Sequence, residues 1–208
     1  KLSYKKAVFF SEFPFYEGSL TYQDFDQAIQ NSLGLIKAKM KQDKLPNTDL
    51  AKNYTVYQFM SDTLRIKMNT PEKKTITHYP MKYDFEDFWG EKDWTKGMVS
   101  KLLRVQTGQC HSMPLLYLIL SESFVAIADG AFSPVHSYIR IKFPSGTFQN
   151  IELTNGYLTS DSYVIRSGVV KAEAWANKVY MDTLSKRQVV ANSILDLAKG
   201  YSNKYGFD

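Results

Sequence analysis

The sequence has only one cysteine among its 208 residues, and this scarcity excludes several kinds of protein. A single thiol cannot form an intramolecular disulfide, so a disulfide-stapled scaffold is ruled out. Long apolar runs are also missing, and without a stretch of about 18 apolar residues no membrane span is predicted. The 26 basic and 21 acidic residues are interspersed and leave a net charge of +5. Without a basic run, nucleic-acid binding is not expected.

The chain begins at Lys1 rather than at a methionine, and no charged-then-apolar leader follows. Either an N-terminal segment has been removed or the chain has been trimmed. If the removed segment was a signal peptide, we expect an exported protein, periplasmic or extracellular; otherwise the compartment stays open. The sequence gives no indication of the oligomeric state or of domains after Asp208.

The composition, 44% hydrophobic and 14% aromatic, predicts one domain over residues 1–208. Apolar residues with helical spacing predict helices over residues 22–41, with Thr21 as the cap, and over residues 50–66. Together they make residues 1–70 a mainly helical layer. A last helix is predicted over residues 185–201 with Gly200 near its end. His78, in a polar stretch, is expected to be exposed to solvent.

Residues 100–160 are predicted to form the core of the domain, with strands at 124–128, 135–143 and 147–154. The middle strand alternates between apolar and polar residues, which is typical of a half-buried antiparallel strand. The turn PSG at residues 144–146 suits a three-residue hairpin loop with glycine in the left-handed conformation. This hairpin would place Tyr138 opposite Glu152, so that His136 and Glu152 become diagonal neighbours on one face.

The cysteine lies in the run GQCHSMP at residues 108–114, directly before an apolar segment. Proline is tolerated only in the first turn of a helix, so Pro114 predicts a helix that starts no earlier than about Cys110. The free N–H groups and the macrodipole of a helix N-terminus favour a thiolate there. A lone cysteine beside an apolar helix is usually buried and inert. The polar neighbours of Cys110 instead favour a catalytic type of site.

Thiol catalysis needs a nucleophile, a proton carrier and a group that orients the carrier, and Cys110, His136 and Glu152 fit these roles. The backbone N–H of Cys110 is a candidate oxyanion donor, assisted by the side chain of Gln109 or Gln106. A zinc site built on Cys110 and His136 with His111 is disfavoured, because paired ligand spacing and a fourth ligand are lacking. No cofactor is expected.

Four motifs stand out along the chain: FEDFWG at 85–90, GQCHSMP at 108–114, HSYI at 136–139 and NIELTNG at 150–156. Together they resemble the transglutaminase-like branch of the papain-like cysteine enzymes, and more closely a group of uncharacterised transglutaminase-like proteins of Bacteroidetes. The resemblance covers residues 20 to 205 and implies an α+β fold in which a central helix beginning at the cysteine packs on a small antiparallel sheet. It also implies a Cys110, His136 and Glu152 triad, in that order along the chain.

The chain departs from the wider superfamily at two positions. Glu152 stands where an aspartate is usual, and His111 follows the cysteine where a tryptophan or a small residue is common. Asn150, two residues before Glu152 on the same face, offers a papain-like amide as the alternative partner of the imidazole. Trp94 and Trp89 are expected in the core or the cleft wall, with Trp94 also a candidate substrate contact.

The sequence therefore predicts a cysteine-dependent acyl-transfer enzyme acting on a peptide or protein amide, with hydrolysis preferred over transfer to an amine. The competing prediction is a protein-interaction module that keeps the fold without the activity. In that case the aromatic segment at residues 83–94 would be a contact surface.

Overall fold

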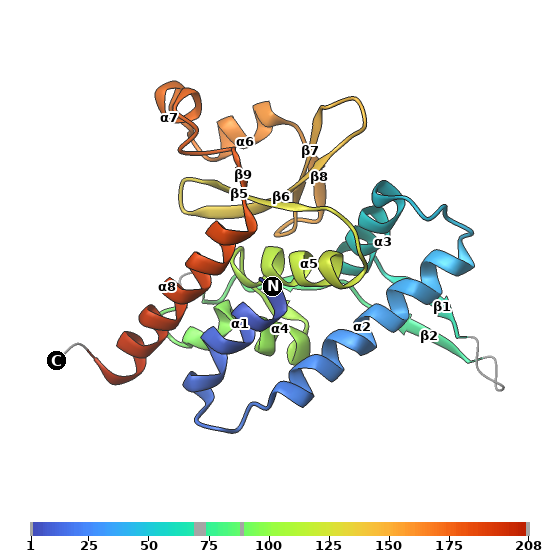
Figure 1. Ribbon diagram of the computed structural model, residues 1–208, viewed down its shortest axis with the longest axis horizontal. Helices are drawn as coiled ribbons and strands as arrows, with labels where there is room; N and C mark the ends of the chain where they lie inside the picture. The colour runs from blue at the N-terminus through green and yellow to red at the C-terminus, as the bar shows by residue number, and fades with distance from the viewer. Residues whose placement is uncertain (1, 69–73, 88–89, 207–208) are drawn as a thin grey trace.

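The computed structural model describes residues 2–68, 74–87 and 90–206 and has a mixed α+β fold, as predicted (Figure 1). The helices are α1 (Tyr4–Glu12), η1 (Phe13–Tyr16), α2 (Tyr22–Gln42), α3 (Asp49–Ser61), η2 (Trp94–Gly97), α4 (Val99–Val105), α5 (Ser112–Ser123), α6 (Asp161–Ser167), α7 (Ala172–Ala176) and α8 (Lys186–Tyr205). The strands are β1 (Leu64–Lys67), β2 (Thr75–His78), β3 (Lys82–Tyr83), β4 (Thr107–Gly108), β5 (Asp129–Ser133), β6 (His136–Lys142), β7 (Phe148–Glu152), β8 (Tyr157–Thr159) and β9 (Thr183–Leu184).

The largest sheet has five antiparallel strands in the order β8-β7-β6-β5-β9. Helix α5 lies on one side of this sheet, and α6 and α7 lie on the other (Figure 1). The remaining strands form two small pairs, β1 with β2 antiparallel and β3 with β4 parallel. The parallel pair matters most for the site, because β4 leads directly into residues 109–111, the cysteine segment, which connects β4 to α5.

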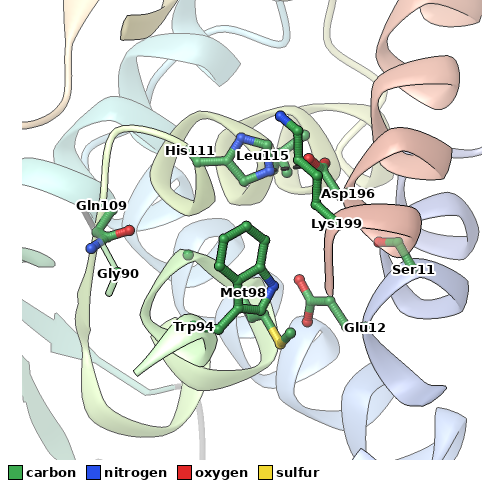
Figure 2. A pocket seen from close by; sticks show the side chains of 11 residues that line it. Ser11, Glu12, Gly90, Trp94, Met98, Gln109, His111, Leu115, Asp196 and Lys199 are labelled. Atoms are coloured by element: carbon green, nitrogen blue, oxygen red, sulfur yellow. Dashed lines mark hydrogen bonds and ion pairs between the residues drawn. The ribbon is translucent and has the colours of Figure 1, made fainter. Parts of the chain in front are cut away.

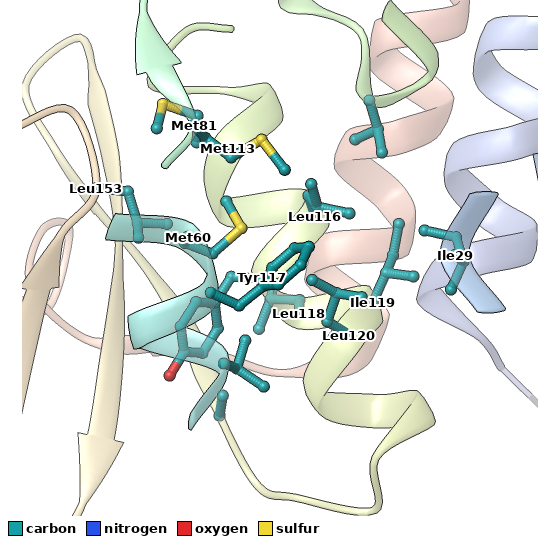
Figure 3. Packing of buried hydrophobic residues seen from close by; sticks show 14 of the residues in the cluster. Ile29, Met60, Met81, Met113, Leu116, Tyr117, Leu118, Ile119, Leu120 and Leu153 are labelled. Carbon is teal, nitrogen blue, oxygen red and sulfur yellow. The ribbon is translucent and has the colours of Figure 1, made fainter. Parts of the chain in front are cut away.

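Helix α5 forms the centre of the hydrophobic core. Nine of its twelve residues are buried, so its apolar character on all sides matches a helix enclosed by neighbours. Figure 3 shows Tyr117 and Leu116 of α5 packed with Met60 of α3, and the Tyr117 hydroxyl donates to the Asn53 carbonyl at 2.8 Å. Each fully buried apolar side chain of this size stabilises the fold by about 1.5–3 kcal/mol. The start of α5, where the cysteine lies, is therefore held by a large core.

The hairpin prediction is confirmed. The Phe143 N–H donates to the Thr147 carbonyl at 2.8 Å, and Gly146 has a φ of +89°. The register pairs Ile139 with Ile151, which sets Tyr138 level with Glu152 as expected. The prediction of a half-buried strand was wrong, because Tyr138 and its neighbours through Ile141 are all buried. The face that carries Tyr138 is covered by Val164 of α6 and by apolar residues that follow it.

Helix α2 is confirmed, with Thr21 accepting from the Asp24 N–H at 3.1 Å. The predicted helix over residues 50–66 ends at Ser61, and its last residues form β1, whose buried and exposed positions alternate. The predicted strand over 124–128 was also wrong. Phe124 caps α5 and Val125 adopts a left-handed φ of 55°, so the strand begins only at Asp129.

Helix α8 runs beyond the predicted end and contains Gly200 in its interior. A Cβ at position 200 would lie 3.2 Å from Trp94 Nε1, so close packing rather than helix termination explains this glycine. None of the helices in residues 2–68, 74–87 and 90–206 has the length and apolar character needed to cross a membrane.

Candidate active site

The cysteine segment is fixed between the β3–β4 pair and the start of α5. Gly108 approaches α5 so closely that a Cβ there would lie 2.6 Å from Ser112 Oγ and 3.1 Å from a Leu102 methyl group. The Ser112 hydroxyl is fully buried and accepts the Gln109 N–H at 3.0 Å, which holds the segment before the helix against its first residue. The sequence prediction that the helix starts no earlier than Cys110 is confirmed, since α5 begins at Ser112 with Pro114 in its first turn.

Cys110 is half-buried, and its carbonyl accepts a hydrogen bond from the Ser137 hydroxyl of β6. This contact ties the cysteine to the strand that carries His136. The Cys110 N–H donates to no acceptor within the part of the chain that the structure describes. A free N–H beside a nucleophile at a helix start is a suitable donor to an oxyanion.

His136 and Glu152 are brought together by the register of β6 and β7. His136 Nε2 lies 2.6 Å from Glu152 Oε2, and the side chains are 27% and 11% exposed. Burial alone would lower the pKa of His136, but hydrogen bonds with the Cys110 thiol and with Glu152 outweigh it and raise the pKa to about 10. The imidazole is therefore held as imidazolium at neutral pH. The structure thus brings His136 and Glu152 into contact, and Cys110 lies close enough to the imidazole to raise its pKa.

Glu152 is itself fixed by the turn that follows β7. Its Oε1 accepts the Thr154 N–H at 3.0 Å and the Thr154 hydroxyl at 2.7 Å, which leaves Oε2 for His136. Burial would raise the pKa of Glu152, but the hydrogen bond and charge of His136, with the two Thr154 bonds, lower it. The carboxylate is thus ionised and aimed at one ring nitrogen, as a group that orients an imidazole must be.

Tyr83 is a site residue that the sequence reasoning missed. It lies at the end of β3, pairs in register with Gly108 of β4 and is half-buried. Burial and the charge of Cys110, together with a hydrogen bond to the Cys110 side chain, raise the pKa of Tyr83 to about 12. Its hydroxyl thus stays protonated and can donate to the sulfur. The parallel pairing that brings residues 83 and 108 together has no local sequence signal, which is why pattern reasoning did not find it.

Asn150 does not act as the partner of the imidazole. It is fully buried, accepts from Arg140 Nε at 3.0 Å and donates to Asp161 Oδ1 at 2.7 Å. Arg140 is also ion-paired with Asp161 at 3.2 Å and donates to the Met181 carbonyl. The Asn150 amide therefore joins β6, β7 and α6, and His136 Nε2 is taken by Glu152.

The remaining predicted residues lie around the cysteine without contacting it. The Gln109 side chain is buried and donates to the Asp87 carbonyl, and its oxygen faces Gly90 and Gly97. Gln106 caps α4 in a left-handed conformation, and its carbonyl accepts the Lys82 N–H. Neither glutamine forms a hydrogen bond with Cys110 among the described residues, so their predicted oxyanion role gains no support.

The predicted aromatic and histidine residues outside the triad take different places in the fold. Trp94 begins η2 and lines a pocket on the Gln109 and His111 side of the segment, while Trp89 lies outside the described residues. His111 points to α8, where its Nε2 lies 2.9 Å from Asp196 Oδ2. His78, expected at the surface, is buried and stacked on Phe59 with ring centroids 4.0 Å apart, because its Nε2 binds the Phe59 carbonyl at 2.6 Å.

Within residues 2–68, 74–87 and 90–206, no group of three or more histidine, cysteine, aspartate or glutamate side chains is arranged to hold a metal ion. Comparison with known proteins finds no family model, no curated protein and no solved structure that matches this chain.

Proposed function

We propose that this chain is a cysteine-dependent acyl-transfer enzyme of the transglutaminase-like, papain-like type, acting on peptide or protein amides. The observation that carries the proposal is the 2.6 Å hydrogen bond between His136 Nε2 and Glu152 Oε2, on an imidazole whose pKa is raised by its interactions with Cys110 and Glu152. A nucleophile, a base and an orienting acid in hydrogen-bond contact are the arrangement that thiol catalysis requires. Cys110 as a residue is half-buried rather than enclosed in the core.

In the first step the Cys110 thiolate attacks the carbonyl carbon of the amide, and the carbonyl π electrons move to the oxygen. The tetrahedral adduct collapses when the C–N bond breaks, and the imidazolium of His136 gives its proton to the departing amine. A thioester on Cys110 remains. Because Glu152 holds Nε2, the proton transferred is the one on Nδ1, the ring nitrogen left for the sulfur side.

The tetrahedral oxyanion needs donors that are fixed before the reaction. The Cys110 N–H, which has no acceptor within the described ranges, supplies one. The Tyr83 hydroxyl, hydrogen-bonded to the thiol and held protonated by its raised pKa of about 12, is suited to supply the second. We assign to Tyr83 a role in stabilising first the thiolate and then the oxyanion.

In the second step neutral His136 takes a proton from water, the resulting hydroxide adds to the thioester carbonyl, and Cys110 leaves as thiolate. The products are a carboxylic acid and the regenerated enzyme. An amine in place of water would give transamidation by the same route. Hydrolysis is the preferred outcome because water is always present, and the chemistry needs no cofactor.

A protein-interaction module is the second candidate, and one observation favours it. Phe85, which follows Tyr83 in the chain, is 80% exposed and packs edge to face on the Tyr83 ring at 4.9 Å. An exposed aromatic residue beside the cysteine suits a contact surface as well as a cleft rim. The two candidates differ in whether Cys110 forms a covalent acyl adduct.

The test is acylation by p-nitrophenyl acetate, followed by intact mass of the acid-quenched protein. We expect a burst of nitrophenolate and one acetyl group on Cys110, both absent in Cys110→Ala and strongly slowed in His136→Ala and Glu152→Gln. Glu173→Gln, the same change at an exposed position of α7, is the matched control and should behave as wild type. Acetylation that does not depend on Cys110, or that is unaffected by His136→Ala, would favour the interaction module.

A further inference from the structure

A pocket lies beside the cysteine segment, and neither Cys110 nor His136 lines it. It is lined by the residues that flank Cys110, Gln109 and His111, and by residues of α1, η2 and α8 (Figure 2). The enclosed space is about 200 Å³. An engineered apolar cavity of ~150 Å³ holds benzene, so this pocket is large enough for one ring with a small substituent.

The acidic groups of the pocket already have partners. Glu12, 5% exposed, accepts the Val99 N–H at 2.6 Å and the Ser100 N–H at 2.9 Å. Burial raises the pKa of Glu12 to about 7, so the group is half neutral near neutral pH. Asp196 is engaged with His111 Nε2 at 2.9 Å. The acceptors of the pocket therefore do not need a cationic ligand.

The hydrogen-bond donors of the pocket, in contrast, have no acceptor in the described part of the protein. Among the described residues, no acceptor is found for Trp94 Nε1, for the second ring nitrogen of His111 or for Lys199 Nζ. Burial would lower the pKa of His111, but the hydrogen bond and charge of Asp196 raise it and favour a ring that carries both protons. The His111 side chain is 42% exposed and Lys199 is exposed, so water or a ligand can accept from both. A ligand that brings acceptors can replace water at these donors, whereas the carboxylates of the pocket are already engaged.

The walls between these donors are apolar. Figure 2 shows the Trp94 ring in the middle of the pocket, with Met98 below it and His111 and Leu115 above it. We propose that this pocket binds a small carboxylate with an apolar, ring-sized body, the body lying against Trp94 and the carboxylate facing His111 and Lys199. The site is separate from the proposed acyl-transfer chemistry, because it needs neither Cys110 nor His136.

The test uses benzoate as the probe and benzylamine, which has a similar size and the opposite charge, as the control ligand. Binding is measured by isothermal titration calorimetry on the full chain and on Cys110→Ala. We expect benzoate to bind both proteins with a Kd below about 1 mM, and benzylamine to bind at least tenfold more weakly. Because Cys110 is not part of the pocket, equal affinity in the two proteins separates this proposal from the proposed enzyme function.

Variants localise the binding. His111→Gln and Lys199→Met each remove a donor that would be charged, and each should weaken benzoate roughly tenfold or more. Trp94→Phe keeps a ring and removes the indole N–H, so it should weaken benzoate less and also abolish any benzoate-dependent change in tryptophan fluorescence. Lys204→Met, on the same helix but outside the pocket lining, is the matched control and should bind as wild type.

Three results would overturn the proposal. Benzoate that fails to bind the folded wild-type protein at millimolar concentration shows that the unused donors do not form a carboxylate site. Preferential binding of benzylamine reverses the charge assignment. Benzoate affinity unchanged in both His111→Gln and Lys199→Met places the ligand elsewhere. Each variant must show a thermal unfolding transition like that of wild type, so that a change in affinity is not caused by misfolding. Lys199→Met is the variant least expected to disturb the fold, because Lys199 is exposed.

Discussion

Replacement of Glu152 by glutamine tests whether the carboxylate of Glu152 keeps the imidazole of His136 protonated. The pKa of His136 is raised from 6.5 to about 10 by Cys110 and Glu152 acting against burial. A rise of that size corresponds to ~5 kcal/mol in favour of the imidazolium. Glutamine keeps an oxygen for Thr154 but removes the charge that faces Nε2 at 2.6 Å. We expect the His136 pKa to fall by about 2–3 pH units, equivalent to ~3–4 kcal/mol.

The raised pKa of His136 also makes the stability of the fold depend on pH. A histidine whose folded pKa is raised stabilises the fold fully below its unfolded pKa of 6.5, and this contribution is lost as the pH rises through about 10. The free energy of unfolding of the wild type should therefore fall across that window by at most ~5 kcal/mol. In Glu152→Gln the fall should be smaller and should end at a lower pH.

The assay is an NMR titration of ¹³C-labelled histidine, which gives three ring signals because the chain has three histidines. His78→Gln and His111→Gln assign the other two signals, and Glu173→Gln is the charge-matched control. A wild-type His136 that titrates near 6.5, or one whose pKa does not change in Glu152→Gln, would refute the reasoning.

Three further predictions concern the supports of the site. In Gly108→Ala the new Cβ would lie 2.6 Å from Ser112 Oγ. We therefore expect urea denaturation to show a free energy of unfolding lower by about 1–3 kcal/mol, and we expect alkylation of Cys110 to slow. Wild-type values in both measurements would contradict the close approach. Asn150→Ala removes the acceptor of the buried Arg140 Nε and the amide that donates to Asp161, so it should lower the free energy of unfolding by ~2–3 kcal/mol in thermal unfolding, while the pH profile of Cys110 alkylation stays unchanged; a changed profile would make Asn150 the partner of the imidazole. Glu12 has a folded pKa raised from 4.5 to about 7, so the native state binds more protons than the unfolded chain and stability falls as the pH rises from about 4.5 to 7. Denaturation curves of Glu12→Gln across that window should lack this fall, and an unchanged slope would show that another group causes it.

The parts of the fold that the sequence predicted depend on local rules. Helix α2 follows from apolar spacing and the Thr21 cap, and the β6–β7 hairpin follows from a left-handed glycine at position 146. The contact of His136 with Glu152 could be predicted because the hairpin register alone determines it. Pro114 likewise located the start of α5.

The parts that were missed depend on pairings between distant segments. Tyr83 reaches Cys110 only because β3 pairs in parallel with β4, a pairing across more than twenty residues. His78 is buried because β2 pairs with β1 and its ring stacks on Phe59 of α3. Gly200 looked like a helix end, but tertiary packing against Trp94 explains it. In each case the local sequence is compatible with either outcome, and the tertiary contact decides.

The central proposal is that Cys110 is a nucleophile activated by the imidazole of His136. The most direct test is the pH dependence of iodoacetamide alkylation at Cys110 in wild type and in His136→Ala, with the product identified by intact mass. The account predicts rapid alkylation below about pH 7 in wild type and its loss in His136→Ala. Alkylation that is slow in wild type, or that follows an ordinary thiol in both proteins, would contradict it.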